Sequence, residues 1–265
     1  MATMLEDLET ILRELGGLLM EWRTLGMTDG HWEGAQLKAD ADRRAHDFLV
    51  EQLRRFWPSI PVISEEDVSK HDACRPDEYW LIDPIDGTAS FCSGFNGFVT
   101  QAALMRKCQP VLAVVHAPAL DLTYAATQDG PAFCNCAVIS TATSGTRAPI
   151  LIDNYPEPRG IARSLYDEIY CGGYVESGSI GLKICRVADG TADLFVKDVT
   201  VRDWDLAPAD LILGRAGGIL TTLAGDSVPY CGGFERVGLI AVANRGVAEQ
   251  VRTWNSPPSN VTINS

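Results

Sequence analysis

The fold of this chain is decided by the stretch Trp80-Leu81-Ile82-Asp83-Pro84-Ile85-Asp86-Gly87-Thr88. An apolar strand pattern comes first, and a proline turn at its end is expected to bring the oxygens of Asp83 and Asp86 together on a hard divalent cation. Gly87 lets the backbone approach a ligand closely, and amides that open a turn or helix can hold phosphate oxygens. Thr88 adds a hydroxyl beside that position. The stretch therefore predicts a site for a metal ion and a phosphate at a strand end.

The same stretch is also compatible with an ordinary surface turn, because Asp, Pro and Gly favour turns for conformational reasons alone. Two further acidic clusters favour the metal site. Ser64-Glu65-Glu66-Asp67 follows the apolar run Pro61–Ile63, and Asp203-Trp204-Asp205 opens a predicted helix. Acidic residues at strand ends and at a helix start are what a multi-metal site needs, whereas a solvated acidic face requires no particular placement.

The charge balance excludes some classes of partner. The chain has 265 residues, and 35 Asp and Glu against 22 Lys and Arg give a net charge of −13. Nucleic acids and anionic membranes need clustered positive charge, so neither is expected as a partner. A small anionic substrate stays compatible with this charge if a metal ion reverses the local field.

The cysteines and the N-terminus indicate an intracellular protein. Eight cysteines are spread along the chain without a Cys-x-x-Cys motif, and the four histidines show no ligand spacing. Scattered reduced thiols are therefore expected, rather than a zinc site or a disulfide framework. The N-terminus is acidic, and no apolar run approaches the roughly 18 residues of a membrane span. These features predict a cytoplasmic location.

Two helices are predicted at the N-terminus. Apolar residues recur at steps of three and four between Leu5 and Trp22, and again from Asp42 to Phe56, where Pro58 ends the pattern. The segment between them, Gly26 to Lys38, contains three glycines and polar residues. It is therefore predicted to be a mobile loop.

The remaining chain predicts two series of strands and helices. Strands are expected first, at Ile60–Ile63, Tyr79–Ile82, Phe98–Met105, Val111–His116 and Leu122–Ala125. A Ser- and Thr-rich junction at Ser140–Arg147 separates them from a second series: strands at Ile150–Asp153, Ala192–Val196, Ile219–Thr222 and Gly238–Ala243, and helices at Leu165–Tyr170, Gly181–Ala188, Leu206–Arg215 and Val247–Trp254. The predicted division is thus an N-terminal half over 1–145, a C-terminal half over 146–255, and a loose tail over 256–265.

The three acidic clusters resemble, in order and context, the inositol monophosphatase family of metal-dependent, lithium-sensitive phosphatases. That family has a Glu-Glu pair after a strand, Asp-Pro-[Ile/Leu]-Asp-Gly-Thr and Trp-Asp-x-Ala, matched here by Glu65-Glu66, Asp83 to Thr88 and Trp204 to Ala207. With Gly178-Ser179, the resemblance covers about residues 5 to 250. It implies an α+β fold built as a layered αβαβα sandwich, and a homodimer.

The resemblance also implies the roles of individual residues. Glu65, Asp83, Asp86 and Asp205, with the backbone carbonyl of Ile85, would hold two or three Mg²⁺ ions. Thr88 would help activate a water molecule, paired with an Asp that lies 23 residues before Glu65. This spacing selects Asp42, with Asp40 as the alternative, because the chain has Ala39-Asp40-Ala41-Asp42 where the family usually has Thr-x-[Ala/Thr]-Asp.

The implied activity is Mg²⁺-dependent hydrolysis of a phosphomonoester by direct attack of metal-activated water, without a covalent enzyme intermediate. Thr88, Asp42 and Glu65 are the implied catalytic residues. Cys92 lies only four residues after Thr88, but no His is near it in the sequence, so a catalytic thiol is not expected. A non-catalytic relative that binds a metal or an anion is the lesser alternative.

The substrate is expected to be a small phosphorylated metabolite, bound by Asp86, Gly87, Thr88 and Asp205 and by the segments 174–183 and 197–203. Gly178-Ser179 followed by Lys183 looks closest to the bacterial 3′(2′),5′-bisphosphate nucleotidases, in which case Lys183 receives the second phosphate. A solvated Lys183 is the alternative. Asp198, seven residues before Asp205, instead favours inositol 1-phosphate, and histidinol phosphate and sugar phosphates stay open.

Overall fold

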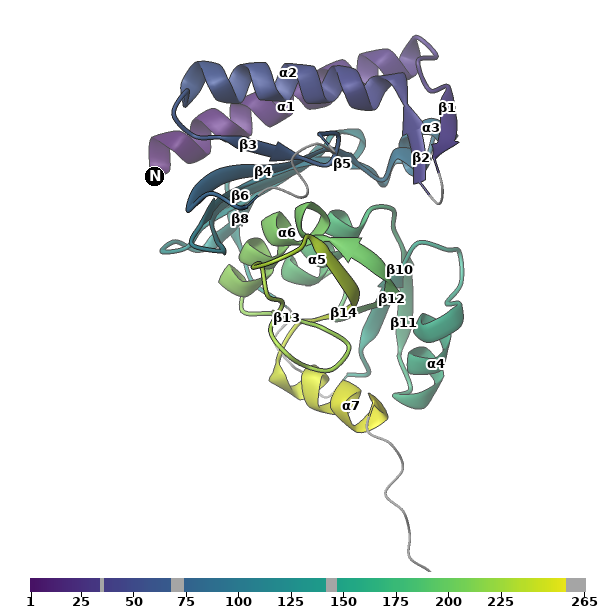
Figure 1. Ribbon diagram of the computed structural model, residues 1–265. Helices are drawn as coiled ribbons and strands as arrows, with labels where there is room; N and C mark the ends of the chain where they lie inside the picture. The colour runs from purple at the N-terminus through teal and green to yellow at the C-terminus, as the bar shows by residue number, and fades with distance from the viewer. Residues whose placement is uncertain (34–35, 68–73, 142–146, 256–265) are drawn as a thin grey trace, which may run out of the picture.

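Helices and sheets alternate in five layers in the computed structural model, which describes residues 1–33, 36–67, 74–141 and 147–255 (Figure 1). A pair of helices covers a seven-stranded sheet, a second pair lies between that sheet and a five-stranded sheet, and a third pair covers the outer face. The predicted α+β class and αβαβα sandwich are confirmed.

The N-terminal helix pair is α1 (Ala2–Thr24) and α2 (Asp40–Phe56). Their apolar stripes face the seven-stranded sheet, and Leu8, Leu12, Leu15 and Leu19 of α1 are fully buried. Each buried leucine stabilises the fold by about 1.5–3 kcal/mol relative to an exposed one. Burial of this stripe therefore holds the first layer in place.

The segment between α1 and α2 differs from the predicted loop. It contains the antiparallel strands β1 (Gly30–Glu33) and β2 (Gln36–Ala39), paired from Gly30 with Ala39 to Glu33 with Gln36. Strands of four residues are too short to show a clear alternation, and backbone hydrogen bonds rather than side chains make the ladder. The prediction of a loop, which rested on the glycine content, was therefore wrong for β1 and β2.

The seven-stranded sheet is mixed: β3 pairs parallel to β4, and every other neighbouring pair is antiparallel. Its order follows the chain: β3 (Val62–Ser64), β4 (Glu78–Asp86), β5 (Val99–Arg106), β6 (Gln109–Ala117), β7 (Leu122–Thr127), β8 (Ala132–Cys134) and β9 (Ala137–Ile139). A short helix, α3 (Thr88–Ser93), follows β4, and a single 3₁₀ turn, η2 (Pro118–Leu120), follows β6. Strands β8 and β9 were not predicted.

Strand β4 corrects the prediction of a turn at Pro84. The strand continues through Pro84 to Asp86, and the pairing with β5 shifts register between Asp83 and Asp86. Proline has no N–H to donate to a ladder, so a bulge is one of the few places where a strand tolerates it. The two carboxylates therefore lie on either side of a bulge within a strand.

The five-stranded sheet has the order β11-β10-β12-β14-β13. Its strands are β10 (Ile150–Asp153), β11 (Gly173–Glu176), β12 (Leu194–Arg202), β13 (Ile219–Thr221) and β14 (Glu235–Val242). Parallel pairing joins β10 to β11 and β12, and antiparallel pairing joins β14 to β12 and β13. The pairing of β12 with β14 shifts register between Lys197 and Thr200.

Helices α5 (Ile180–Ala188) and α6 (Asp203–Arg215) fill the layer between the two sheets, and α4 (Gly160–Glu168) and α7 (Arg245–Asn255) cover the outer face of the second sheet (Figure 1). The predicted junction overlaps 142–146, and the predicted tail is 256–265; both lie outside the described residues. A division near residue 145 stays a proposal. Among the described helices, none combines the length and the apolarity that a membrane crossing requires.

Candidate metal centre and substrate cavity

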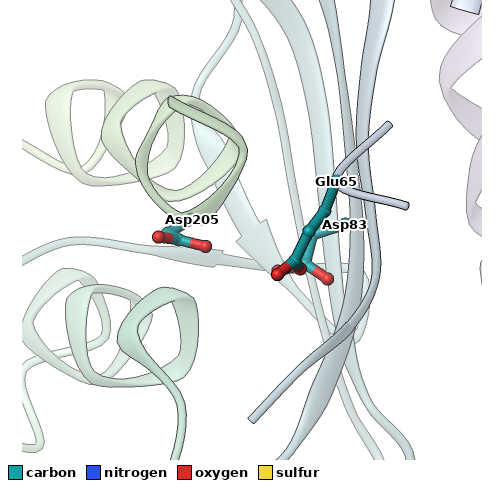
Figure 2. Close-up of side chains that lie close together, drawn as sticks. All are labelled: Glu65, Asp83 and Asp205. Carbon is teal, nitrogen blue, oxygen red and sulfur yellow. The ribbon is translucent and has the colours of Figure 1, made fainter. Parts of the chain in front are cut away.

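Three predicted metal ligands meet between the two sheets. Glu65 follows β3, Asp83 lies on β4 and Asp205 is in the first turn of α6. One carboxylate oxygen from each lies within 4.8 Å of the others. Figure 2 shows Glu65 and Asp83 side by side, with the Asp205 carboxylate facing them from the helix.

Backbone hydrogen bonds hold the three residues in place. The Glu65 N–H donates to the Ile82 carbonyl (3.3 Å), which ties the end of β3 to β4. The Ile85 N–H donates to Asp83 Oδ1 (3.1 Å) across the strand bulge. The Arg202 N–H donates to Asp205 Oδ2 (2.7 Å), as expected for an acidic residue at the third position of a helix. The backbone of Glu65 and the carboxylates of Asp83 and Asp205 are thus held by β4 and by the start of α6.

Asp86 borders this group and lies against the N-terminus of α5. Its Oδ2 accepts from the Gly181 N–H (2.7 Å), and its Oδ1 accepts from the Ile180 N–H at 3.4 Å. A carboxylate is stabilised there by the unpaired amides and the dipole of the helix. Asp86 therefore connects the carboxylate group to α5.

Gln101, which the sequence gave no reason to select, ties Asp86 to α6. Its side chain is fully buried, and its amide donates to Asp86 Oδ2 (3.3 Å) and to the Trp204 carbonyl (3.0 Å). Pro208 stands four residues after Trp204 and has no N–H, so it cannot provide the helical hydrogen bond to that carbonyl. Gln101 supplies the missing donor and links the two sides of the site.

The electrostatics of the site favour a bound cation. Burial raises the pKa of Asp83, and the carboxylates of Glu65, Asp86 and Asp205 raise it further. Burial also raises the pKa of Asp205, and Asp86 and Glu65 raise it further. Burial raises the pKa of Asp86 to about 6, although the Gly181 N–H and Lys183 oppose the shift. Like charges this close are relieved by a divalent cation, and carboxylate oxygens suit a hard ion such as Mg²⁺.

The predicted pair of Thr88 and Asp42 is in contact. Asp42 is only 3% exposed, and the Thr88 hydroxyl lies 3.1 Å from Asp42 Oδ1 and 3.3 Å from the Ile85 carbonyl. Its single hydrogen can be donated to either oxygen. The alternative, Asp40, is the first residue of α2 and is exposed. The geometry therefore favours Asp42 as the partner of Thr88.

Glycines at two turns bring the halves of the site together. Gly87 precedes α3 with φ of 91°, in the left-handed region that glycine adopts without strain. Gly178 lies against the backbone of Gly97, and a Cβ there would overlap the Gly97 carbonyl. The next residue, Ser179, donates its N–H to that carbonyl (2.6 Å), and its hydroxyl accepts from the Leu182 N–H (3.1 Å) as the N-cap of α5.

Asp86 and Gly87 line a cavity of about 500 Å³. Its other lining residues include Phe95, Asn154, Ser179, Lys183 and Lys197. Asp86, which borders the carboxylate group, therefore lines the same cavity as the ammonium groups of Lys183 and Lys197.

Lys183 is not on the surface, so the alternative of a solvated lysine is wrong. Its side chain is 2% exposed, and Nζ donates to the Gly178 carbonyl (2.7 Å) and lies 4.0 Å from Asp153 Oδ1. Burial lowers its pKa to about 8, and Asp153 opposes that shift. The apolar face of α5 is turned toward the core, and Lys183 is tolerated within it because its charge has these partners.

Lys197, in the second segment expected to border the site, is the more accessible of the two lysines. Its side chain is 17% exposed, and Nζ lies 3.0 Å from Asp153 Oδ1 and 2.8 Å from Asn154 Oδ1. Asp198 follows it in the irregular part of β12 and is exposed. The described lining of the cavity does not include Asp198.

The cysteines fit the expectation of reduced thiols: all eight are free. Burial raises the pKa of Cys92, and Asp42 and Asp29 raise it further. A thiol held in its neutral form is a poor nucleophile, which agrees with the prediction that Cys92 is not catalytic.

Comparisons with known proteins identify relatives over most of the chain. A model of the inositol monophosphatase family matches residues 23–255. The 3′(2′),5′-bisphosphate nucleotidase CysQ of Haemophilus influenzae is 34% identical over 194 residues, which cover 68% of this chain and 70% of that protein. The fructose-1,6-bisphosphatase/inositol-1-monophosphatase of Thermotoga maritima is 29% identical over 227 residues, which cover 81% of this chain and 83% of that protein.

A solved structure gives the same result for the fold. The inositol monophosphatase of Thermotoga maritima matches with a TM-score of 0.81 and 26% identity, covering 96% of this chain and 97% of that one. The region matched by the family model contains all four predicted carboxylates and Thr88. The expectation of an enzyme is confirmed over that of a non-catalytic relative. The chain belongs to the inositol monophosphatase family and is a phosphomonoesterase of that family.

Proposed function

We propose that the protein removes one phosphate from a nucleoside 3′(2′),5′-bisphosphate in an Mg²⁺-dependent reaction. The observation that carries this proposal is the pair of ammonium groups, Lys183 and Lys197, in the cavity that opens beside the carboxylates. A substrate with two phosphates would place one beside Asp86 and the other near the lysines. The similarity to a 3′(2′),5′-bisphosphate nucleotidase supports the same substrate class.

The carboxylates fit Mg²⁺ by their chemistry and their spacing. Glu65, Asp83 and Asp205 would hold it, with Asp86 and the Ile85 carbonyl at the border of the group. When bound, Mg²⁺ lowers the pKa of water and neutralises charge on the phosphate. Lithium inhibition, which the family resemblance implies, is part of this proposal and would be measured in the same assay.

Thr88 and Asp42 would orient the attacking water. In this role the Asp42 carboxylate would accept the hydroxyl hydrogen of Thr88, which would leave the lone pairs of Thr88 Oγ1 to accept a hydrogen bond from water. One hydrogen of the water would then be held at Thr88 Oγ1, and the water oxygen would face the phosphorus atom of the substrate. The backbone amides at Gly87 and Thr88, at the start of α3, would contact phosphate oxygens.

The two lysines give their part of the cavity a net positive charge. Asp153, which is 1% exposed, is shared between them, so two ammonium groups have one buried carboxylate. Glu176 also lines the cavity but is exposed, where water screens its charge. Phe95 lines the same cavity and is 38% exposed, which offers an aromatic face to a nucleobase.

The test measures the effect of one substitution, Lys197→Ala, on the KM values of two substrates. Lys197→Ala should raise KM for adenosine 3′,5′-bisphosphate by roughly ten- to a hundredfold, because a charge-assisted hydrogen bond contributes about 1.5–3 kcal/mol. Its kcat should change little, because the contact is made equally in the ground and transition states. The variant should not alter KM for inositol 1-phosphate. Equal effects on both substrates would contradict the proposal.

Hydrolysis of inositol or sugar phosphates is the second candidate function. Asp198 occupies the position at which the family resemblance implies a contact with polyol hydroxyls, and one relative is a fructose-1,6-bisphosphatase/inositol-1-monophosphatase. If this function is correct, Asp198→Ala should raise KM for inositol 1-phosphate and leave adenosine 3′,5′-bisphosphate unaffected. A phosphate-release screen that includes histidinol phosphate and several sugar phosphates ranks the candidates directly.

A further inference from the structure

Arg75 lies outside the carboxylate group, yet every N–H of its guanidinium has an acceptor. The side chain is 7% exposed. Nε donates to Gly232 O (2.9 Å), Nη1 to Tyr230 O (2.7 Å) and Tyr79 Oη (3.2 Å), and Nη2 to Gly233 O (2.7 Å) and to Asp203 Oδ2 (2.6 Å). A guanidinium has five N–H donors in a rigid fork, so this set uses all of them.

These acceptors belong to both sheets of the sandwich. Tyr79 lies on β4 of the seven-stranded sheet, whereas the three carbonyls precede β14 of the five-stranded sheet and Asp203 is the first residue of α6. The Phe234 ring lies 3.9 Å from the Arg75 guanidinium carbon. The Asp203 N–H donates to the Phe234 carbonyl (3.0 Å), so the loop and the helix start are themselves joined. Arg75 thus connects the two sheets at one point.

That point is close in the chain to two of the carboxylates. Asp203 is two residues before Asp205 in the first turn of α6, and Tyr79 is four residues before Asp83 on β4. The separation of Asp83 and Asp205 therefore depends on how the start of α6 is held against β4. Arg236 also contacts Asp203 (3.2 Å), but it belongs to the five-stranded sheet and does not reach across to β4 through this contact.

We propose that Arg75 is a positioning residue of the metal centre, which acts through Asp203 to hold Asp205 within reach of Glu65 and Asp83. This inference rests on the proposed function, because it requires that the carboxylates bind Mg²⁺. Without Arg75, the first turn of α6 keeps its hydrogen bonds to its own sheet and the Gln101 contact to the Trp204 carbonyl, but it loses its ionic link to the residues that lead into β4. Loss of a partner that orients a ligand typically weakens metal binding by about 10–100-fold.

The test measures Mg²⁺ binding to the full chain by calorimetry, without substrate. Arg75→Met should raise the Kd for Mg²⁺ by about 10–100-fold, and Arg75→Lys, which can keep the ion pair with Asp203, should restore much of that loss. The matched control is Arg147→Met, which breaks the ion pair of Arg147 with Asp193 (2.8 Å) away from the site. The control should leave the Kd for Mg²⁺ within about twofold of that of the unmodified protein.

A double substitution tests whether Arg75 acts through Asp203. Asp203→Asn alone should raise the Kd for Mg²⁺ by more than about tenfold, and adding Arg75→Met should raise it little further, because effects on one shared interaction are not additive. If Arg75→Met does not fold, Asp203→Asn and Arg75→Lys still decide the question. A folded Asp203→Asn protein with unchanged Mg²⁺ affinity would overturn the inference.

The control and the unmodified protein separate this inference from the proposed function. If the unmodified protein does not bind Mg²⁺, the proposed function itself is contradicted. If it binds Mg²⁺ and Arg75→Met binds equally well, only the positioning role is wrong. An equal loss of affinity in Arg75→Met and Arg147→Met would show a general effect on the fold and would also overturn the role.

Discussion

Replacing Asp83 by asparagine should make the metal-free protein more stable while removing its response to Mg²⁺. Asp83 is 1% exposed, and its carboxylate lies within 4.8 Å of those of Glu65 and Asp205. Two unit charges at that distance repel by about 3.5 kcal/mol at an effective dielectric constant of about 20. Asparagine keeps the acceptor oxygen for the Ile85 N–H, so the substitution removes the charge and preserves the hydrogen bond.

The expected gain is smaller than the full repulsion, because burial already raises the pKa values of Asp83 and Asp205 and protonation relieves part of the charge. A net gain of about 2 kcal/mol would raise Tm by about 4–8 °C for a chain of this size. Where a folded-state pKa is raised, as for Asp86 to about 6, the folded protein holds more protons than the unfolded chain. The stability from that protonation is full below about pH 4 and is lost as pH rises through about 6. The gain from Asp83→Asn should therefore be larger at about pH 8 than at about pH 5.

Thermal unfolding followed by circular dichroism, in chelator and in excess Mg²⁺, measures both effects. Mg²⁺ should raise the Tm of the unmodified protein and leave that of Asp83→Asn unchanged. Asp121→Asn is the matched control, because Asp121 is an exposed residue away from the carboxylates and asparagine tolerates its left-handed conformation. A lower Tm for metal-free Asp83→Asn, or an undiminished Mg²⁺ response, would refute the reasoning.

Four further outcomes are expected. Thr88→Ala and Asp42→Asn should each lower kcat by about a hundredfold or more in steady-state assays, with little change in KM. Gly178→Ala should destabilise the protein by about 1–3 kcal/mol in denaturant titrations because its Cβ has no space, whereas Gly17→Ala, with open space in α1, should be neutral or stabilising. Burial lowers the pKa of His116 to about 4, so the stability that depends on its neutral form is full above about pH 6.5 and is lost as pH falls toward 4. When the free energy of unfolding is measured over a pH series, His116→Asn should reduce its dependence on pH in that range. Light scattering should give the mass of a homodimer, and a monomer would contradict that expectation.

Local patterns in the sequence predicted the parts of the fold that depend on local burial. The leucines of α1 repeat at helical spacing because one face of the helix is buried, so Leu8 to Leu19 predict both the helix and its buried side. The acidic motifs predicted three carboxylates that the structure brings together: Glu65 directly after β3, Asp83 beside the bulge in β4 and Asp205 in the first turn of α6. The helix and its buried face are determined by neighbours that are close in the chain, whereas the meeting of the carboxylates was implied by the family resemblance of their motifs.

Features that depend on distant parts of the chain could not be predicted. The bulge at Pro84 depends on how β4 pairs with β5, and the burial of Lys183 depends on Asp153, thirty positions away in another element. Arg75 gave no local sign of its role, because its acceptors lie more than 120 residues further along the chain, apart from Tyr79. A single sequence shows these residues, but their pairing is established only when the two sheets are packed together.

Phosphate release from adenosine 3′,5′-bisphosphate, measured as Mg²⁺ is added back to protein freed of metal by a chelator, tests the central claim most directly. We expect no release without metal, a saturable rise in rate with Mg²⁺, and one phosphate per nucleotide, with no rise for Asp83→Asn. Full release in excess chelator would contradict the metal centre, and no release at any Mg²⁺ concentration would contradict the bisphosphate nucleotide as substrate.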